Sequence, residues 1–337
     1  MFNVLITVFV IFGMIVGAGF ASGNEIVVYF SRFGNISYVY IIIASILLFI
    51  ALLFLMMHGK NIAKRIENSK FLILMTIIIS VVFSSSMYAG IDNLLAYFPK
   101  FWHVFLMLFV LLLCLFVTIK GIGGLEKFNL FLMPVLAILF LICLCFAAGN
   151  STNFIITNEH AFAGVIFSPL YVALNTSMSV FVLAKQGEKL SKNQAIFACL
   201  FSVLLLSFFL LFGNYVLLKN PESFVSEMPI LFIVKDNFCV FIFEFFVILV
   251  GCFSTLISLC FTLKNSFKKI LKNNYFGIFL SVFLPYFICC VGFSRIISFF
   301  YPICSVLGIF ILLFAIFSFK QTDEIIHPKS KNTQDGS

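Results

Sequence analysis

The chain has 337 residues, of which 63% are hydrophobic and 10% are charged, and its mean hydropathy is +1.18. A soluble domain carries about 25% charged residues, so this chain lacks the polar side chains needed to cover a water-facing surface. The composition therefore excludes a soluble fold and predicts an all-α integral membrane protein. The net charge of +8 could indicate nucleic-acid binding, but the distribution of the basic residues argues against it.

Ten apolar stretches follow one another along the chain, and a membrane helix needs about 20 such residues. We predict spans at about 2–33, 36–57, 71–97, 102–118, 126–148, 160–184, 194–218, 238–263, 275–293 and 296–318. Residues 1–320 are thus expected to form one transmembrane transporter domain. The polar segment 321–337 is expected to be a disordered cytoplasmic tail.

The 21 Lys and Arg residues are distributed unevenly between the two predicted sides of the membrane. If the N-terminus is inside, the outer loops hold only Arg32, Lys100, Lys219, Lys235 and Arg295. Inner loops of membrane proteins carry the excess of basic residues. The positive charge is therefore a topology signal, and both termini are predicted to be cytoplasmic. The compact loops are typical of a multi-pass protein of a bacterial cell (inner) membrane.

The first predicted span is too long for one straight membrane helix and has a loop-like interior, Gly17-Ala-Gly-Phe-Ala-Ser-Gly23. Non-helical backbone survives at membrane depth only where protein or a water-filled cavity satisfies its polar groups. Ser22 and Glu25 have the spacing of a capping box. We therefore predict a half-helix ending near Val16, a hinge, and a second half-helix starting at Ser22. Close helix packing would explain these glycines equally well from this span alone.

The sixth predicted span carries a second interruption, Ser168-Pro169, followed by Tyr171 and Asn175-Thr176-Ser177. Interruptions in corresponding halves of a membrane protein indicate a transporter binding site. Because these two lie five spans apart, we predict two inverted five-helix repeats, about 1–150 and 156–320. The sixth span is expected to be unwound over 168–176.

The eighth predicted span places three small or hydroxyl-bearing residues on one helix face, Gly251, Ser254 and Thr255, at i, i+3 and i+4. Uncharged hydroxyl oxygens suit a weakly held monovalent cation. The alternative is that both hydroxyls bond back to carbonyls one turn earlier. The broken first span favours the ion site.

The motif Gly17-Ala-Gly-Phe-Ala-Ser-Gly-Asn-Glu25 resembles the GAGFASGQE-like signature of YkvI-like bacterial membrane proteins, with Asn24 in place of the usual glutamine. These proteins are similar to the amino acid–polyamine–organocation superfamily, whose LeuT-like 5+5 fold has broken helices 1 and 6. Tyr171 and Asn175 resemble a motif of the sixth span. The resemblance implies this fold, a transport role, and a sodium ion held by the Ser254 and Thr255 hydroxyls with carbonyls of Gly13 and Val16.

Glu25 is an acidic residue within a predicted span, and such residues are functional candidates. It either completes the capping box or carries a coupling proton. Tyr88 and Tyr171 offer hydroxyl groups to a small polar site, and Phe20 is placed to pack on a ligand. The predicted solute-contacting residues are Gly17, Ala18, Gly19, Phe20, Ser22, Gly23, Glu25, Tyr88, Tyr171 and Asn175.

Together these patterns predict a secondary active transporter, a sodium-coupled symporter of a small polar solute such as an amino acid. A proton-coupled symporter or exchanger of the same fold is the alternative. A channel and a non-transporting sensor or scaffold are the alternatives of another class. No Ser–His, metal-ligand or Walker pattern predicts an enzyme. The expected partners are the solute, the coupling sodium ion and the lipid bilayer, with no other cofactor, no nucleic acid and no obligatory protein partner.

Overall fold

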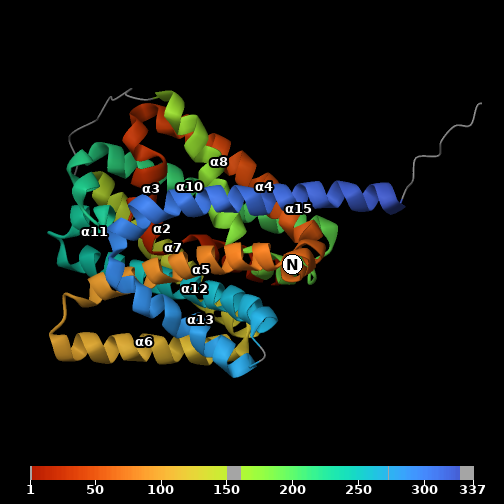
Figure 1. The fold of residues 1–337 in the computed structure, drawn as a ribbon. Coiled ribbons are helices and arrows are strands. Elements are labelled where there is room, and N and C mark those ends of the chain that lie inside the picture. Colours follow the sequence, from red (N-terminus) through yellow and green to blue (C-terminus); the bar gives the residue numbers. More distant parts are fainter. Residues whose placement is uncertain (1, 150–160, 272, 327–337) are drawn as a thin grey trace, which may run out of the picture.

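The computed structural model describes residues 2–149, 161–271 and 273–326, and within these residues it contains helices and no strand (Figure 1). The first half consists of α1 (Phe2–Ile15), α2 (Ala18–Ala21), α3 (Asn24–Tyr29), η1 (Ser31–Ile36), α4 (Ser37–Asn68), α5 (Lys70–Leu95), α6 (Lys100–Lys120) and α7 (Ile122–Gly149). The second half consists of α8 (Ala161–Ser177), α9 (Val180–Gly187), α10 (Lys192–Lys219), η2 (Pro221–Val225), α11 (Pro229–Val234), α12 (Phe238–Ile270), α13 (Asn274–Ile288), η3 (Cys289–Val291), α14 (Phe293–Arg295), η4 (Ile296–Phe300) and α15 (Tyr301–Ile326).

Eight described helices are long and apolar enough to cross a membrane. The pair α8 and α9, bent by 66° at its junction, supplies a further span, and the shorter apolar α1 leads into α2 and α3. The predicted all-α architecture of about ten spans, with the first and sixth broken, is therefore confirmed.

Helix α12 lies at the centre of the bundle. Its residues from Val247 to Leu263 are buried almost without interruption, apart from half-buried Leu249. It packs against α5, α7, α13, α1 and α2, while α4 packs against α8, α9 and α10. Helix α6, at the edge of the bundle in Figure 1, instead exposes Phe101, Val104 and Phe109, as expected of a lipid-facing helix. The broken first helix thus lies against a largely buried central helix.

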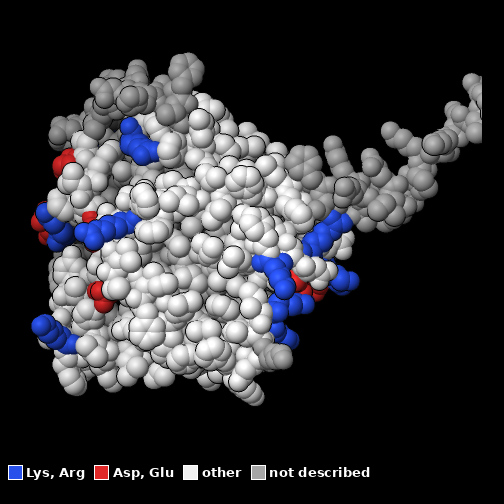
Figure 2. All heavy atoms as spheres, viewed as in Figure 1, with Lys and Arg blue, Asp and Glu red and all other residues white. Residues whose placement is uncertain are grey.

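Charged side chains gather at two opposite ends of the molecule, with a broad uncharged band between them on the face shown in Figure 2. At one end, Lys269 pairs with Glu67 at 2.9 Å and Lys189 pairs with Glu126. These contacts join loops that were all predicted to face the same side. At the other end, His103 Nε2 lies 2.8 Å from Asp92 Oδ1.

Two predicted boundaries, the start of the tail and the junction between the repeats, lie near or beyond the ends of the described segments. Helix α15 continues to Ile326, so residues 321–326 extend this helix beyond the predicted start of the tail. Residues 327–337 and the predicted junction between the repeats lie outside the described residues.

Candidate functional site

The first break begins where α1 ends at Ile15. The Gly17 N–H donates to the Ile15 carbonyl at 2.9 Å, so it no longer serves the Gly13 carbonyl one turn earlier. Gly17 has extended backbone, and α2 covers only the next four residues. Gly23 then adopts φ 84°, a left-handed conformation that favours glycine, before α3 begins. The sequence prediction of a hinge between Gly17 and Gly23 agrees with these two turning points.

The predicted capping box at this hinge is wrong. Gly23, rather than Ser22, precedes α3, and no side chain caps that helix. The Ser22 hydroxyl lies 3.5 Å from the Asn24 N–H and donates to the Gly19 carbonyl at 3.4 Å. The Glu25 carboxylate instead accepts a hydrogen bond from Asn175 Nδ2. The left-handed turn at Gly23 shifts the start of the helix by one residue, which removes the spacing that a capping box needs.

The second break also differs from the prediction. Helix α8 runs without interruption through 168–176, with Pro169 inside it, and the chain bends only after Ser177. The Ser168 hydroxyl does not cap a helix; it donates to the Tyr40 carbonyl of α4 at 3.0 Å. Around the bend, the Ser179 hydroxyl donates to the Asn175 carbonyl at 2.8 Å. Helix α12 also contacts the bend, since the Thr262 hydroxyl lies 3.3 Å from the Met178 carbonyl and 3.1 Å from the Ser258 carbonyl of its own helix.

Four oxygen atoms from three helices meet beside the first break. The Ser254 and Thr255 hydroxyls of α12 lie 2.9 and 3.0 Å from the Gly13 carbonyl of α1. Asn129 of α7 adds its Oδ1 at 2.6 Å from the Ser254 hydroxyl. A Cβ on Gly13 would collide with the Ser254 hydroxyl, and one on Gly251 would lie 2.9 Å from the Val16 carbonyl. The two glycines therefore allow α1, α7 and α12 to converge, and the contact partner of both hydroxyls is α1.

A second buried cluster surrounds Glu25, which is only 4% exposed. Asn175 Nδ2 lies 3.4 Å from Glu25 Oε1 and donates to the Tyr171 carbonyl at 3.0 Å. A Cβ on Gly19 would lie 3.0 Å from Glu25 Oε2, so this glycine leaves room for the carboxylate. Glu25 has no ion-pair partner in the part of the chain that the structure describes. A buried carboxylate in this situation requires a proton or a cationic ligand.

Three tyrosine side chains lie around Glu25. Tyr29, Tyr171 and Tyr301 are each fully buried and lie within electrostatic range of its carboxylate. The rings of Tyr29 and Tyr171 pack edge to face, 5.6 Å apart. The Tyr29 hydroxyl bonds to Ser305 at 2.7 Å and the Tyr301 hydroxyl to Ser86 at 2.5 Å. The Tyr171 hydroxyl has no partner among the described residues, which makes it the available polar group of the cluster.

Several predicted solute contacts lie elsewhere. The ring of Tyr88 packs against Tyr286 of α13, at 5.8 Å between ring centroids, and Phe20 packs against Phe140 of α7, at 6.3 Å. At the inner edge of the hinge, the Ala18 N–H lies 3.3 Å from the Met87 sulfur. Of the predicted side chains, the structure thus brings Glu25, Tyr171 and Asn175 together, with Gly19 beside them.

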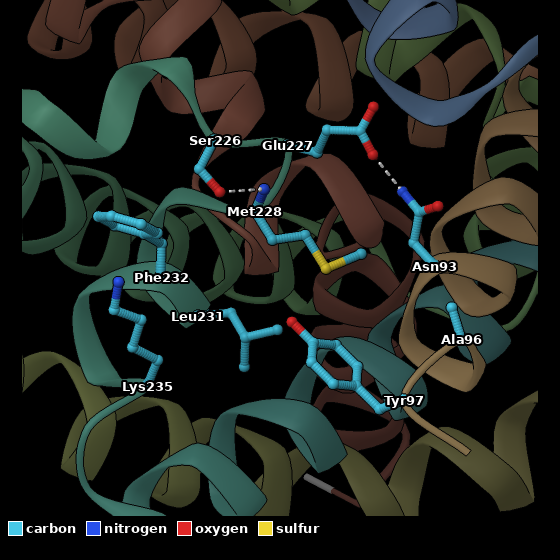
Figure 3. A pocket seen from close by; sticks show the side chains of 9 residues that line it. All are labelled: Asn93, Ala96, Tyr97, Ser226, Glu227, Met228, Leu231, Phe232 and Lys235. Atoms are coloured by element: carbon cyan, nitrogen blue, oxygen red, sulfur yellow. Dashed lines mark hydrogen bonds between the residues drawn. The ribbon is translucent and has the colours of Figure 1, made fainter. Parts of the chain in front are cut away.

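The segment before and within α11 covers one side of the hinge. The Ile230 N–H donates to the Ser22 carbonyl at 2.9 Å, and Asn24 Nδ2 donates to the Glu227 carbonyl at 3.0 Å. Asn93 of α5 donates to the Glu227 carboxylate at 2.5 Å (Figure 3). These contacts border a cavity of about 390 Å³, whose lining includes Tyr97 and Lys235. Hydrogen bonds that α11 and the segment before it make with the hinge, α3 and α5 therefore cover the hinge on this side.

Sequence reasoning missed Asn129, Tyr29, Ser86 and Tyr301. Asn129 follows Glu126 and Lys127, so it has the appearance of a residue at the inner end of a span. Tyr301 lies near the start of the last span, where tyrosines usually belong to the membrane interface. Their roles depend on contacts between helices that are distant in the sequence.

Two comparisons, one of structures and one of sequences, relate this chain to known proteins. The fold is that of LeuT-like transporters: it matches the structure of Mhp1, a nucleobase-cation-symport-1 family transporter in a closed conformation with bromovinylhydantoin bound. That match has a TM-score of 0.60 and 15% identity, and covers 92% of this chain and 77% of that one.

In sequence, the chain is 25% identical over 317 residues to the uncharacterized membrane protein YkvI of Bacillus subtilis (strain 168). The alignment covers 88% of this chain and 90% of YkvI, so the predicted resemblance to YkvI-like proteins is confirmed. No family model matches the chain.

Proposed function

We propose that this protein is a secondary active transporter that couples the movement of a small polar solute to sodium. The observation that carries the proposal is the convergence of the Ser254 and Thr255 hydroxyls on the Gly13 carbonyl at the first break. The fold shared with Mhp1, a transporter by its description, supports the same class of function.

The donor set suits a sodium ion. Gly13 and Val16 contribute neutral carbonyl oxygens, and Ser254 and Thr255 contribute neutral hydroxyl oxygens. The Gly251 position lets α12 approach the Val16 carbonyl. Hard oxygen ligands without formal charge favour a monovalent cation over a divalent one, because no carboxylate offsets a second positive charge. A bound sodium ion would supply the electrostatic link between α1 and α12 in this proposal.

The solute is proposed to occupy the level of Glu25, Tyr171 and Asn175, next to the same hinge. Glu25 would hold an ammonium group, because a charge-assisted hydrogen bond is the strongest interaction that a buried carboxylate offers. The unpartnered Tyr171 hydroxyl would bond to a second polar group of the solute. An amino acid or a related amine has this chemistry.

The geometry suggests how the ion and the solute are coupled. The ion site uses carbonyls at the end of α1, and the proposed solute site uses α3, on the other side of the four-residue α2. Both ligands would thus fix the same hinge, which α11 covers on one side. Movement of the hinge between two arrangements would expose the sites to alternate sides of the membrane.

The test is a thermal-stability titration of the purified protein with sodium chloride against potassium chloride at equal ionic strength. A ligand that binds only the folded state raises the melting temperature. We expect sodium to stabilise the parent, and the double change Ser254→Ala with Thr255→Val to abolish this response. The matched control is Thr76→Val with Ser80→Ala, which removes a buried threonine and serine hydroxyl from α5. A double variant that responds to sodium like the parent would place the ion elsewhere.

A proton-coupled transporter is the second candidate, and the position of Glu25 favours it. The failed capping box leaves this buried carboxylate without a role in ending or starting a helix. Uptake into proteoliposomes under separate sodium and proton gradients distinguishes the two forms of coupling.

A further inference from the structure

Asn129 is fully buried on α7, in contact with the oxygen cluster that we assign to the coupling ion. Its Oδ1 lies 2.6 Å from the Ser254 hydroxyl. The same hydroxyl lies 2.9 Å from the Gly13 carbonyl, and the Thr255 hydroxyl lies 3.0 Å from that carbonyl. The cluster therefore contains three short oxygen–oxygen contacts.

These contacts outnumber the protons that are present to bridge them. Each hydroxyl has one hydrogen, whereas carbonyl and amide oxygens have none. Ser254 cannot donate to Gly13 and to Asn129 at once, so one short contact joins two lone pairs. The amide nitrogen of Asn129 meanwhile has no hydrogen-bond partner among the described residues, although it is buried. An unpaired buried N–H group destabilises the folded state.

The unbridged oxygen–oxygen contact and the unpaired N–H group both depend on which end of the Asn129 amide faces Ser254. A half-turn of the amide exchanges its oxygen and nitrogen. With nitrogen towards Ser254, an N–H donates to the hydroxyl, which then donates to Gly13, and every contact is bridged without an ion. With oxygen towards Ser254, the two hydroxyl protons leave one of the three oxygen–oxygen contacts unbridged, and a cation among these oxygens would offset the facing lone pairs.

We propose that Asn129 is a further ligand of the coupling ion and, after a half-turn of its amide, a replacement for that ion. This inference rests on the proposed function. When sodium is bound, Oδ1 coordinates it together with Gly13, Ser254 and Thr255. When sodium is absent, the N–H group takes over its contact with Ser254 and keeps α7, α1 and α12 together. The ion-free protein is therefore stabilised at the same position where the ion binds.

Two substitutions separate these roles. Asn129→Leu has a similar shape but neither oxygen nor N–H, so we expect the half-saturating sodium concentration to rise at least about tenfold, equivalent to about 1.4 kcal/mol. Asn129→Asp keeps an oxygen ligand, adds charge and lacks the N–H. We expect it to lower the half-saturating concentration and to widen the difference between melting temperatures in sodium and in potassium. Asn214→Leu, which removes another fully buried asparagine, should leave the half-saturating concentration unchanged.

The readout is the melting temperature of the purified full chain as sodium chloride replaces potassium chloride. Opposite shifts for Leu and Asp support the proposal. Shifts in the same direction, or a half-saturating concentration within about twofold of the parent in Asn129→Leu, would overturn it. If Asn129→Leu does not fold, the direction of the Asn129→Asp shift decides. A parent that does not respond to sodium contradicts the ion site itself, whereas a responsive parent with an equally responsive Asn129→Leu variant contradicts only the role of Asn129.

Discussion

Glu25 shows how little of a residue's environment is contained in its local sequence. Its spacing from Ser22 indicates a helix cap, but its carboxylate points across to Asn175 on α8, which lies 150 positions along the chain. The spacing is misleading because the left-handed turn at Gly23 moves the start of the helix. Gly13, Ser254 and Thr255 are the opposite case, because the resemblance to LeuT-like proteins implied that these hydroxyls lie beside the Gly13 carbonyl, and the structure contains that contact.

The first prediction concerns this carboxylate. Glu25→Gln preserves shape and the contact with Asn175 but removes the charge that would hold an ammonium group or a proton. Hydrogen bonds to charged groups are worth about 1.5–3 kcal/mol, so we expect solute uptake to fall by at least about tenfold. The measurement is uptake of a radiolabelled amino-acid mixture into proteoliposomes under sodium and proton gradients applied separately.

The control for this experiment is Glu244→Gln, which changes another fully buried carboxylate, beside Cys143 and away from the hinge. It should leave uptake unchanged. Equal loss of uptake in both variants would indicate a general effect of buried carboxylates and would remove Glu25 from the solute site.

The second prediction concerns Gly13. Its missing side chain creates the space that the Ser254 hydroxyl and the Asn129 amide occupy, since an added Cβ would lie 2.8 Å from Asn129 Nδ2. Gly13→Ala should therefore lower the free energy of unfolding by about 1–3 kcal/mol and weaken the sodium response. Gly123→Ala on α7, where an added Cβ meets nothing within 4 Å, is the matched control and should change neither. A Gly13→Ala protein with parental stability and sodium response would contradict the close packing described here.

At the level of elements, the two broken helices differ in how well their breaks can be predicted from the sequence. The first break has two glycines at its turning points, so the sequence predicts its ends within two residues. The second was expected at Ser168-Pro169, yet α8 continues through it, because neighbouring helices can satisfy the backbone around a proline in a membrane helix. The bend follows Asn175, Thr176 and Ser179, whose side chains bond to carbonyls three or four residues earlier. Such bonds compete with regular helix geometry, but the same residue types are common in unbroken helices.

The third prediction tests the support that α12 gives to this bend. Thr262→Val removes the hydroxyl that lies 3.3 Å from the Met178 carbonyl and keeps the shape of the side chain. The same hydroxyl lies 3.1 Å from the Ser258 carbonyl within α12, so the contact with the bend is what Thr262→Val loses in addition to an intrahelical bond. Its loss should lower the free energy of unfolding by about 1–3 kcal/mol, measured by thermal unfolding in detergent. Thr76→Val is the control, because the Thr76 hydroxyl bonds only within its own helix, to the Leu72 carbonyl. Equal losses of unfolding free energy in the two variants would mean that the contact between α12 and the bend does not stabilise the folded protein.

On the scale of the whole molecule, hydropathy predicts most of the fold, because crossing the bilayer imposes helices of a set length. The count of spans follows from it, whereas the break in the first helix was predicted from its glycines and the side that the loops share from their basic residues. The site is only partly predictable. Asn129 and Tyr301 contribute through packing between distant helices, and neither has a neighbouring pattern that distinguishes it from an ordinary polar residue near a span end.

The fourth prediction concerns orientation. The basic loops predict that the end carrying the Lys269–Glu67 pair is cytoplasmic. We therefore expect Val225→Cys, at a position 92% exposed in the loop before α11, to react with a membrane-impermeant maleimide in intact cells. Lys64→Cys, at the opposite end, should react only after permeabilisation. The parent chain, with its native cysteines, gives the background, and the reverse pattern would invert the topology.

Helix α12 touches both breaks: Ser254 and Thr255 reach the first, and Thr262, two turns further along, reaches the second. A rigid helix with two such contacts makes the breaks one thermodynamic system. If sodium at the first break increases the affinity for the solute by some factor, the solute must increase the affinity for sodium by the same factor. The coupling free energy between ion and solute would then depend on how firmly α12 holds both breaks, and not only on the strength of either binding site.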